Sequence, residues 1–138
     1  MKRRVFLTAA VIAMLPLTAL AGGITIEYDR SDPIKAALKA GKTVMVDYAA
    51  EWCSTCQIRQ RVIGSLRGEN PAYEDIVFVR VDWDRFAHDP VARDHNIPRR
   101  STLIVLKGNK ELGRIVASTS RSSIKKLMDK ALAAAQTS

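Results

Sequence analysis

Cysteine and histidine are both scarce in this sequence, with two of each among 138 residues. A closed zinc site needs four ligands, and His88 and His95 lie more than thirty residues from the cysteines without a paired spacing. One copy of the chain is therefore not expected to complete a structural zinc site. Two copies that share their cysteines could do so.

Aromatic residues are also few, at 6% of the chain. The lysines and arginines give a formal net charge of +8, but they are spread along the chain and are not interleaved with an aromatic platform. This composition argues against a nucleic-acid surface and predicts only a mild preference for acidic partners. Because the sequence also lacks internal repeats, linkers and low-complexity tracts, a single domain is expected.

A long apolar run occupies residues 5–20, directly after a basic stretch at residues 2–4, and it ends in a small-x-small pattern at residues 19–21. This order is typical of a signal peptide. A proline interrupts the run and no cationic stop follows it, which favours a cleaved signal over a permanent anchor. The paired arginines fit a twin-arginine signal as well as a Sec signal. We therefore expect a signal peptide at residues 1–21 and a mature domain at residues 22–138 that is periplasmic or otherwise exported and not stably embedded in a membrane.

The remaining sequence alternates between strand and helix patterns in the order β-α-β-α-β-α-β-β-α. Strands are predicted at residues 24–28, 43–49, 76–81, 102–106 and 111–117, and helices at residues 33–40, 53–66, 90–95 and 122–133. Residue 64 is a possible kink or end of the second helix, and residues 68–71 and most of 84–95 are predicted as loops. The strand at residues 43–49 is apolar on both faces except at Asp47, which is typical of a central strand covered on both sides. The order predicts an α/β fold with a central mixed β-sheet flanked by helices on both faces.

Cys53 and Cys56 are separated by only two residues, and three interpretations compete for them: a structural staple, half of a metal site, or a reversible dithiol. A disulfide that closes so short a loop stabilises the fold by only about 2 kcal/mol, so a staple is poorly placed here. The metal and dithiol interpretations both remain open on spacing alone.

The position of the pair, where a strand hands over to a helix, suits the dithiol. Cys53 would lie near the first turn, where the positive end of the helix dipole favours a thiolate. Cys56 would lie one turn further along the same face, within disulfide reach and better covered. One sulfur could then attack a disulfide and the other resolve the product. Arg59 and Arg61 would add positive potential to the helix.

Residues 46–56, VDYAAEWCSTC, resemble the active-site segment of the thioredoxin superfamily. The similarity extends from about residue 42 to the C-terminus, and the predicted order of strands and helices fits the thioredoxin fold. The long connection at residues 84–95 is most similar to the exported reductase domains of the DsbD C-terminal type.

The resemblance implies a role for each matching residue. Cys53 matches the attacking cysteine and Cys56 the resolving one, so that the two form a reversible Cys53–Cys56 disulfide. Trp52 matches the aromatic residue that shields the pair and borders the substrate groove. Asp47 matches a buried acid that takes the proton from Cys56. An unpaired carboxylate in an apolar strand should have a raised pKa. Arg80 lies where the family often has a lysine near that acid.

Two departures from the family pattern bear on the site. The dipeptide Ser54-Thr55 replaces the Gly-Pro of thioredoxin itself. Ser101 occupies the slot of the family's cis-proline, and Pro98 lies three residues too early to replace it. A trans Arg100–Ser101 bond is expected, since a cis bond before a non-proline residue costs roughly 3–4 kcal/mol. The Ser101 hydroxyl and the Arg100 cation would then face the sulfurs and bind substrates with acidic groups, and a Ser101→Pro substitution is expected to restore the family geometry.

The sequence thus predicts an exported thiol–disulfide oxidoreductase without a cofactor that acts on protein disulfide clients. A reductase is favoured because the sequence has no inserted helical subdomain of the kind that oxidases of the superfamily carry, and a reductase outside the cytoplasm implies a membrane electron donor. The alternative is a metal- or iron–sulfur-binding protein that uses the same cysteines, possibly as a dimer. The resemblance implies that the family's cis-proline protects the cysteine pair from metals, and its absence here favours this alternative.

Overall fold

The computed structural model describes residues 23–137. Its strands are β1 (Thr25–Glu27), β2 (Thr43–Ala49), β3 (Val77–Asp82), β4 (Thr102–Lys107) and β5 (Lys110–Val116). Its helices are α1 (Pro33–Lys39), α2 (Ser54–Glu69), the 3-10 helix η1 (Pro71–Asp75), α3 (Trp83–Phe86), α4 (Pro90–Arg93) and α5 (Arg121–Ala135). The predicted signal peptide at residues 1–21 lies outside the described residues. Within those residues, no helix is both long and apolar enough to cross a membrane.

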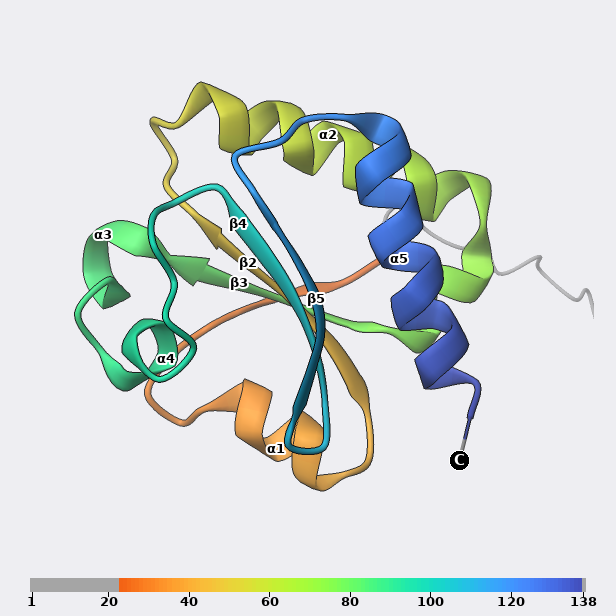
Figure 1. Ribbon diagram of the computed structural model, residues 1–138, viewed down its shortest axis with the longest axis horizontal. Coiled ribbons are helices and arrows are strands. Elements are labelled where there is room, and N and C mark those ends of the chain that lie inside the picture. Colours follow the sequence, from red (N-terminus) through yellow and green to blue (C-terminus); the bar gives the residue numbers. More distant parts are fainter. Residues whose placement is uncertain (1–22, 138) are drawn as a thin grey trace, which may run out of the picture.

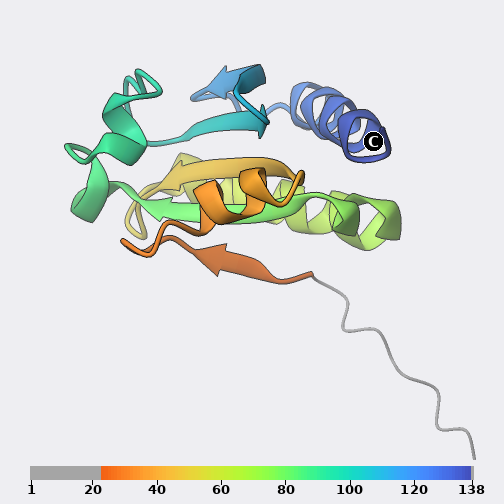
Figure 2. The ribbon, with the colours of Figure 1, turned by 90° about the horizontal axis from the view of Figure 1, so that it is seen from below.

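The five strands form one mixed sheet in the order β1-β3-β2-β4-β5, which Figure 2 shows from bottom to top. The central strand β2 is parallel to β3 and antiparallel to β4. All seven residues of β2 are buried, as the two-sided apolar pattern predicted. The predicted α/β fold, a mixed sheet with helices on both faces, is confirmed.

Successive side chains of a strand point to opposite faces of the sheet, and β2 divides its residues between two cores. Val44, Val46 and Tyr48 pack with residues of α1, α3 and α4, whereas Met45 packs with residues of α2, η1 and α5. Figure 1 shows α2 and α5 on one side and α1 on the other. By this alternation Asp47 shares the face of Met45, where α2 covers the sheet.

Helix α2 is longer than the sequence predicted. It was expected to run through Leu66, with Gly64 as a possible kink or end, but it continues to Glu69, into residues expected to form a loop. Its inner face buries Ile63 and Leu66 against the sheet, whereas a side chain at Gly64 would meet open space. Packing of the inner face thus outweighs the weak helix propensity of one glycine.

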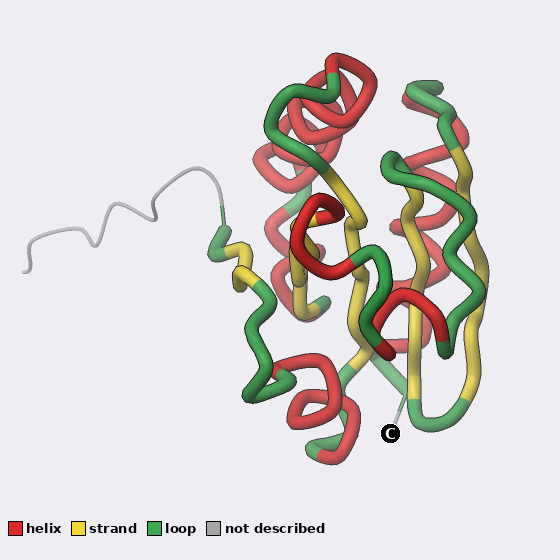
Figure 3. The backbone as a smooth tube through the Cα atoms, turned by 90° about the vertical axis from the view of Figure 1, so that its left-hand side faces the viewer, coloured by secondary structure: helices red, strands yellow, loops and turns green. Residues whose placement is uncertain are grey.

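The connection from β3 to β4 is more ordered than the predicted loop. It holds two short helices, α3 and α4, and Figure 3 shows both facing the viewer at the near end of the sheet. The carboxylate of Asp82 caps α3 by accepting a hydrogen bond from the backbone N–H of Asp84, at 3.0 Å. α4 covers only the first part of the helix expected at residues 90–95.

Candidate active site

The two cysteines lie at the turn from β2 into α2 and are joined by a disulfide, with their Cα atoms 5.2 Å apart. Cys53 is the N-cap of α2, and its sulfur accepts a hydrogen bond from the backbone N–H of Cys56 at 3.2 Å. Cys53 retains 4% of its surface in contact with solvent, whereas Cys56 has none. In reduced protein, the same N–H and the helix dipole would stabilise a Cys53 thiolate.

Trp52 and Arg100 form the surface beside Cys53. The Trp52 side chain is 60% exposed, and its indole N–H donates to Asp84 Oδ2 at 2.8 Å. The Arg100 guanidinium lies over the Trp52 ring, 4.3 Å from its centroid. The Arg100 cation, which was predicted to turn toward the sulfurs, rests on the indole face of the residue that precedes Cys53. The exposed Trp52 side chain is not part of the hydrophobic core.

Asp47 is buried, as predicted, but it is not unpaired. Arg59 of α2 is completely buried, and its Nη2 lies 2.5 Å from Asp47 Oδ1. Arg59 was predicted only to add positive potential to the helix, and its pairing with Asp47 was not predicted. A helical spacing of three residues from Cys56 was the signal that could have identified it, since this spacing places Arg59 on the same helix face as the buried cysteine.

Burial raises the pKa of the Asp47 carboxyl above its ordinary value. The positive charge of Arg59 offsets part of this effect, with smaller contributions from Arg80 and Gln60. Arg80 lies opposite Asp47 in the parallel register of β2 and β3, as its resemblance to the family lysine suggested, and its guanidinium is 3.9 Å from Glu27. A carboxyl group with a raised pKa is better matched to accepting a proton near neutral pH.

A cavity of about 290 Å³ lies beside Asp47, and Gln60, Gly64 and Arg80 are among the residues that line it. Asp47 itself is 9% exposed. A proton taken up by this carboxyl group can therefore pass to water without crossing the disulfide.

Ser101 follows a trans peptide bond, since no cis bond occurs in the described residues, and its φ is +62°. Its N–H donates to the carbonyl of Tyr48 at 2.7 Å, and its carbonyl accepts from the N–H of Ala117 and from Arg59 Nη1. The Ser101 hydroxyl is buried and makes no hydrogen bond with any described atom, so it does not contact a sulfur in this way. A proline at position 101 does not fit the observed backbone, because proline lacks the N–H and requires a φ near −65°, so restoring the family geometry by Ser101→Pro would require the loop to rearrange.

Among residues 23–137, no three side chains of histidine, cysteine, aspartate or glutamate gather closely enough to hold a metal ion. Cys53 and Cys56 alone supply two of the four ligands of a structural zinc site.

A mixed sheet with helices on both faces, and a Cys-x-x-Cys pair capping the helix after the central strand, define the class of dithiol–disulfide exchange domains. The sequence profile of the thioredoxin family matches residues 27–130, and the chain belongs to this family. It is a thiol–disulfide oxidoreductase.

Known relatives agree with this assignment. The chain is 27% identical to a thioredoxin H-type of Brassica campestris over 120 residues, which cover 87% of this chain and 93% of that protein. It is 32% identical over 85 residues to a thioredoxin of Echinococcus granulosus, covering 62% and 75% of the two chains. Among solved structures, Trxlp from Edwardsiella tarda EIB202 superposes with a TM-score of 0.65 at 26% identity, over 75% of this chain and 98% of that one.

We expect Asp47→Asn to slow the second step of disulfide exchange, because an amide cannot accept the proton of Cys56. General-base removal at this scale predicts a decrease of about a hundredfold at pH 7. The rate of this step should also lose its rise with pH through the Asp47 titration. Stopped-flow measurement on reduced protein with a small disulfide checks both effects. An unchanged rate at pH 7 would show that Cys56 loses its proton elsewhere.

Proposed function

We propose that this protein is an exported reductase of protein disulfides, similar to the reductase domains of the DsbD C-terminal type. The observation that carries the proposal is the unequal exposure of the two sulfurs. Cys53 caps α2 beside the exposed Trp52–Arg100 stack, whereas Cys56 is fully buried behind it. A client disulfide can therefore approach one sulfur only.

The chemistry proceeds in two exchanges. The Cys53 thiolate attacks one sulfur of the client disulfide, forms a mixed disulfide and releases the other client sulfur as a thiolate. Cys56 then gives its proton to Asp47 and attacks the Cys53 sulfur. This forms the Cys53–Cys56 bond and releases the second client sulfur with its electron pair. The client gains two electrons, and the protein must be reduced again by a donor dithiol.

Reduction is favoured over oxidation by what lies between β3 and β4. In the described chain this connection holds only two four-residue helices, α3 and α4. Superfamily oxidases carry an inserted helical subdomain. The stack of Arg100 on Trp52 supports clients with acidic groups near the disulfide, since it keeps a cation on the side chain of the residue that precedes Cys53.

Export rests on the basic and apolar pattern of residues 1–21. An exported dithiol meets an oxidising compartment, so its return to the reduced form requires electrons from across the membrane. We therefore include a membrane electron donor in the proposal.

The test begins with the full-length chain produced in a bacterium with a periplasm. We expect the periplasmic fraction to contain a protein that begins at Gly22. The Cys53–Cys56 pair should be reversibly oxidised, with a reduction potential below about −200 mV when it is equilibrated with glutathione. Protein that keeps residues 1–21 and remains in the cytoplasm would contradict export. A potential near −120 mV, typical of a strong oxidant, would contradict a reductase.

Metal analysis of the same protein, purified without chelator, tests the alternative. One ion or cluster for every two chains, with thiols that react only after the metal is stripped, would assign the cysteines to metal binding. Metal-free protein with two reactive thiols supports the reductase.

A further inference from the structure

Arg59 is an unusual residue to find beneath a reactive dithiol. Its side chain is completely buried, and a buried guanidinium is costly unless its charge and its N–H groups are satisfied. Two of its nitrogens are satisfied, one by the Asp47 carboxylate and one by the main-chain carbonyl of Ser101, whereas Nε has no partner among the described residues. A residue retained at this cost, between the acid and the loop opposite the cysteines, points to a role in the chemistry.

The second buried arginine of α2 provides a comparison. Arg67 lies in the last turn of the helix and is 6% exposed. It pairs with Glu74 through two nitrogens and also donates to Ile24 and Thr25. Arg67 therefore joins α2, η1 and β1 at the end of the helix far from the cysteines, which is a purely structural arrangement.

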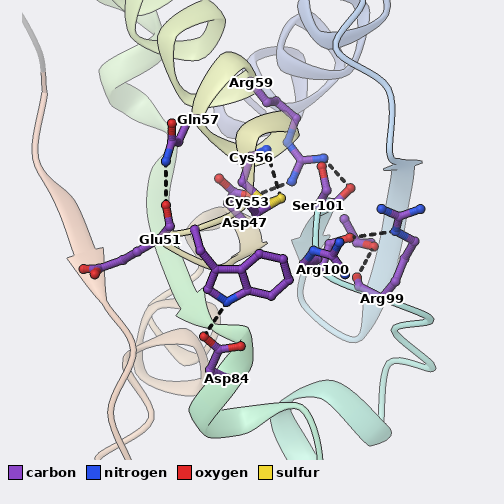
Figure 4. The surroundings of a disulfide bond; sticks show 12 residues. Asp47, Glu51, Cys53, Cys56, Gln57, Arg59, Asp84, Arg99, Arg100 and Ser101 are labelled. Atoms are coloured by element: carbon purple, nitrogen blue, oxygen red, sulfur yellow. Dashed lines mark hydrogen bonds and ion pairs between the residues drawn. A yellow bond between two sulfur atoms is a disulfide. The ribbon is translucent and has the colours of Figure 1, made fainter.

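We infer that Arg59 is a positioning residue for the dithiol exchange, whose single guanidinium holds the Asp47 carboxylate beside the cysteine pair and ties it to the Ser101 carbonyl (Figure 4). The inference depends on dithiol exchange, which family membership establishes, and not on export or on the direction of electron flow. Arg59 contacts the acid and the loop, and its role is to position the carboxylate that accepts the proton.

The charge balance of the second exchange explains why a cation is useful there. When Cys56 gives its proton to Asp47, the negative charge moves from the carboxylate to the sulfur, while the positive charge of Arg59 stays in place. Arg59 lies three residues after Cys56 on the same helix face, so it is close to both positions of the negative charge. The proton transfer then proceeds without leaving either a buried anion or a buried cation unopposed.

The other charged and polar groups around Asp47 are few. Gln60 neighbours it from α2, and Arg80 faces it from β3, where Glu27 of β1 partly neutralises that arginine. From β4, the residue in register with Asp47 is the apolar Leu103. Arg67 lines the same cavity but is neutralised by Glu74, about 12 Å from Arg59 along the helix. Arg59 is thus the only one of these cations in direct contact with the carboxylate.

The test measures the second exchange as a function of pH. Reduced protein reacts with the aromatic disulfide 5,5′-dithiobis(2-nitrobenzoate), and the two thiolates are released in two separate absorbance phases. In Arg59→Met, we expect the midpoint of the second phase to move upward by about one pH unit or more, because a carboxyl group that loses an adjacent guanidinium is harder to ionise. The rate of this phase at pH 7 should fall about tenfold, whereas the first phase should change little.

Three further variants separate positioning from structure. Arg67→Met removes a buried arginine from the same helix and should lower thermal stability without moving the midpoint. Arg59→Lys keeps the charge and should restore the wild-type midpoint. In an Asp47→Asn background, Arg59→Met should produce no further change in the pH profile.

Arg59→Gln serves if the methionine variant does not fold, since glutamine is neutral but can still donate to the Ser101 carbonyl. It should show the same upward movement of the midpoint. If either neutral variant folds and keeps the wild-type midpoint, Arg59 has a structural role only and the inference is overturned. Because the assay contains no protein client, its outcome is independent of the proposed reductase function.

Discussion

Replacing Cys56 by serine should convert the protein from a catalyst into a trap. Cys53 can still attack a client disulfide, but no second sulfur is present to release it, so a covalent protein–client adduct accumulates. Turnover should fall by about a thousandfold or more, the scale seen when an essential nucleophile is removed. Non-reducing electrophoresis with mass analysis of the adduct checks the result.

The matched control is Cys53→Ser, which makes the same change of one atom at the other sulfur. Because Cys56 has no exposed surface, this variant should form no adduct with the same client. Equal trapping by both variants would show that the two sulfurs are equally accessible and would contradict the assigned roles.

The second large effect is expected at Ser101. Ser101→Pro removes the N–H that donates to Tyr48 and cannot adopt a φ of +62°, so it should lower the free energy of unfolding by about 3 kcal/mol. Urea denaturation of the oxidised protein measures this value.

Ser101→Gly is the control for the same position. Glycine adopts a positive φ without strain and also removes a buried hydroxyl that has no hydrogen-bond partner within residues 23–137. This variant should be as stable as the wild type or more stable by about 1 kcal/mol. If proline were tolerated and glycine were the destabilising residue, the loop would have to rearrange into the cis-proline geometry of the family.

The features that the sequence predicted well depend on local patterns. The apolar run at residues 43–49 predicted both ends of β2 correctly, because a strand covered on both faces is apolar along its whole length. The cysteine spacing after that strand identified the reactive turn. The burial of Asp47 followed from its place in the same run.

The features that the sequence did not predict depend on contacts between distant segments. Arg59 is buried because it reaches Asp47, twelve residues earlier, and Ser101, forty-two residues later. The helical spacing from Cys56 separates this arginine from Arg61, which is exposed on the same helix, but it does not reveal these two distant partners. Arg100 was expected to face the sulfurs, but its direction is set by the exposed Trp52 ring on another element.

The Arg67 contacts have a practical consequence for handling the protein. They fasten Ile24 and Thr25 to the last turn of α2, whereas Cys53 caps the first. A helix of 16 residues is about 24 Å long, so an attachment ahead of residue 23 enters the domain at the opposite end from the reactive sulfur. A copy tethered to a bead or sensor surface through that end would present Cys53 outward, open to clients arriving from solution.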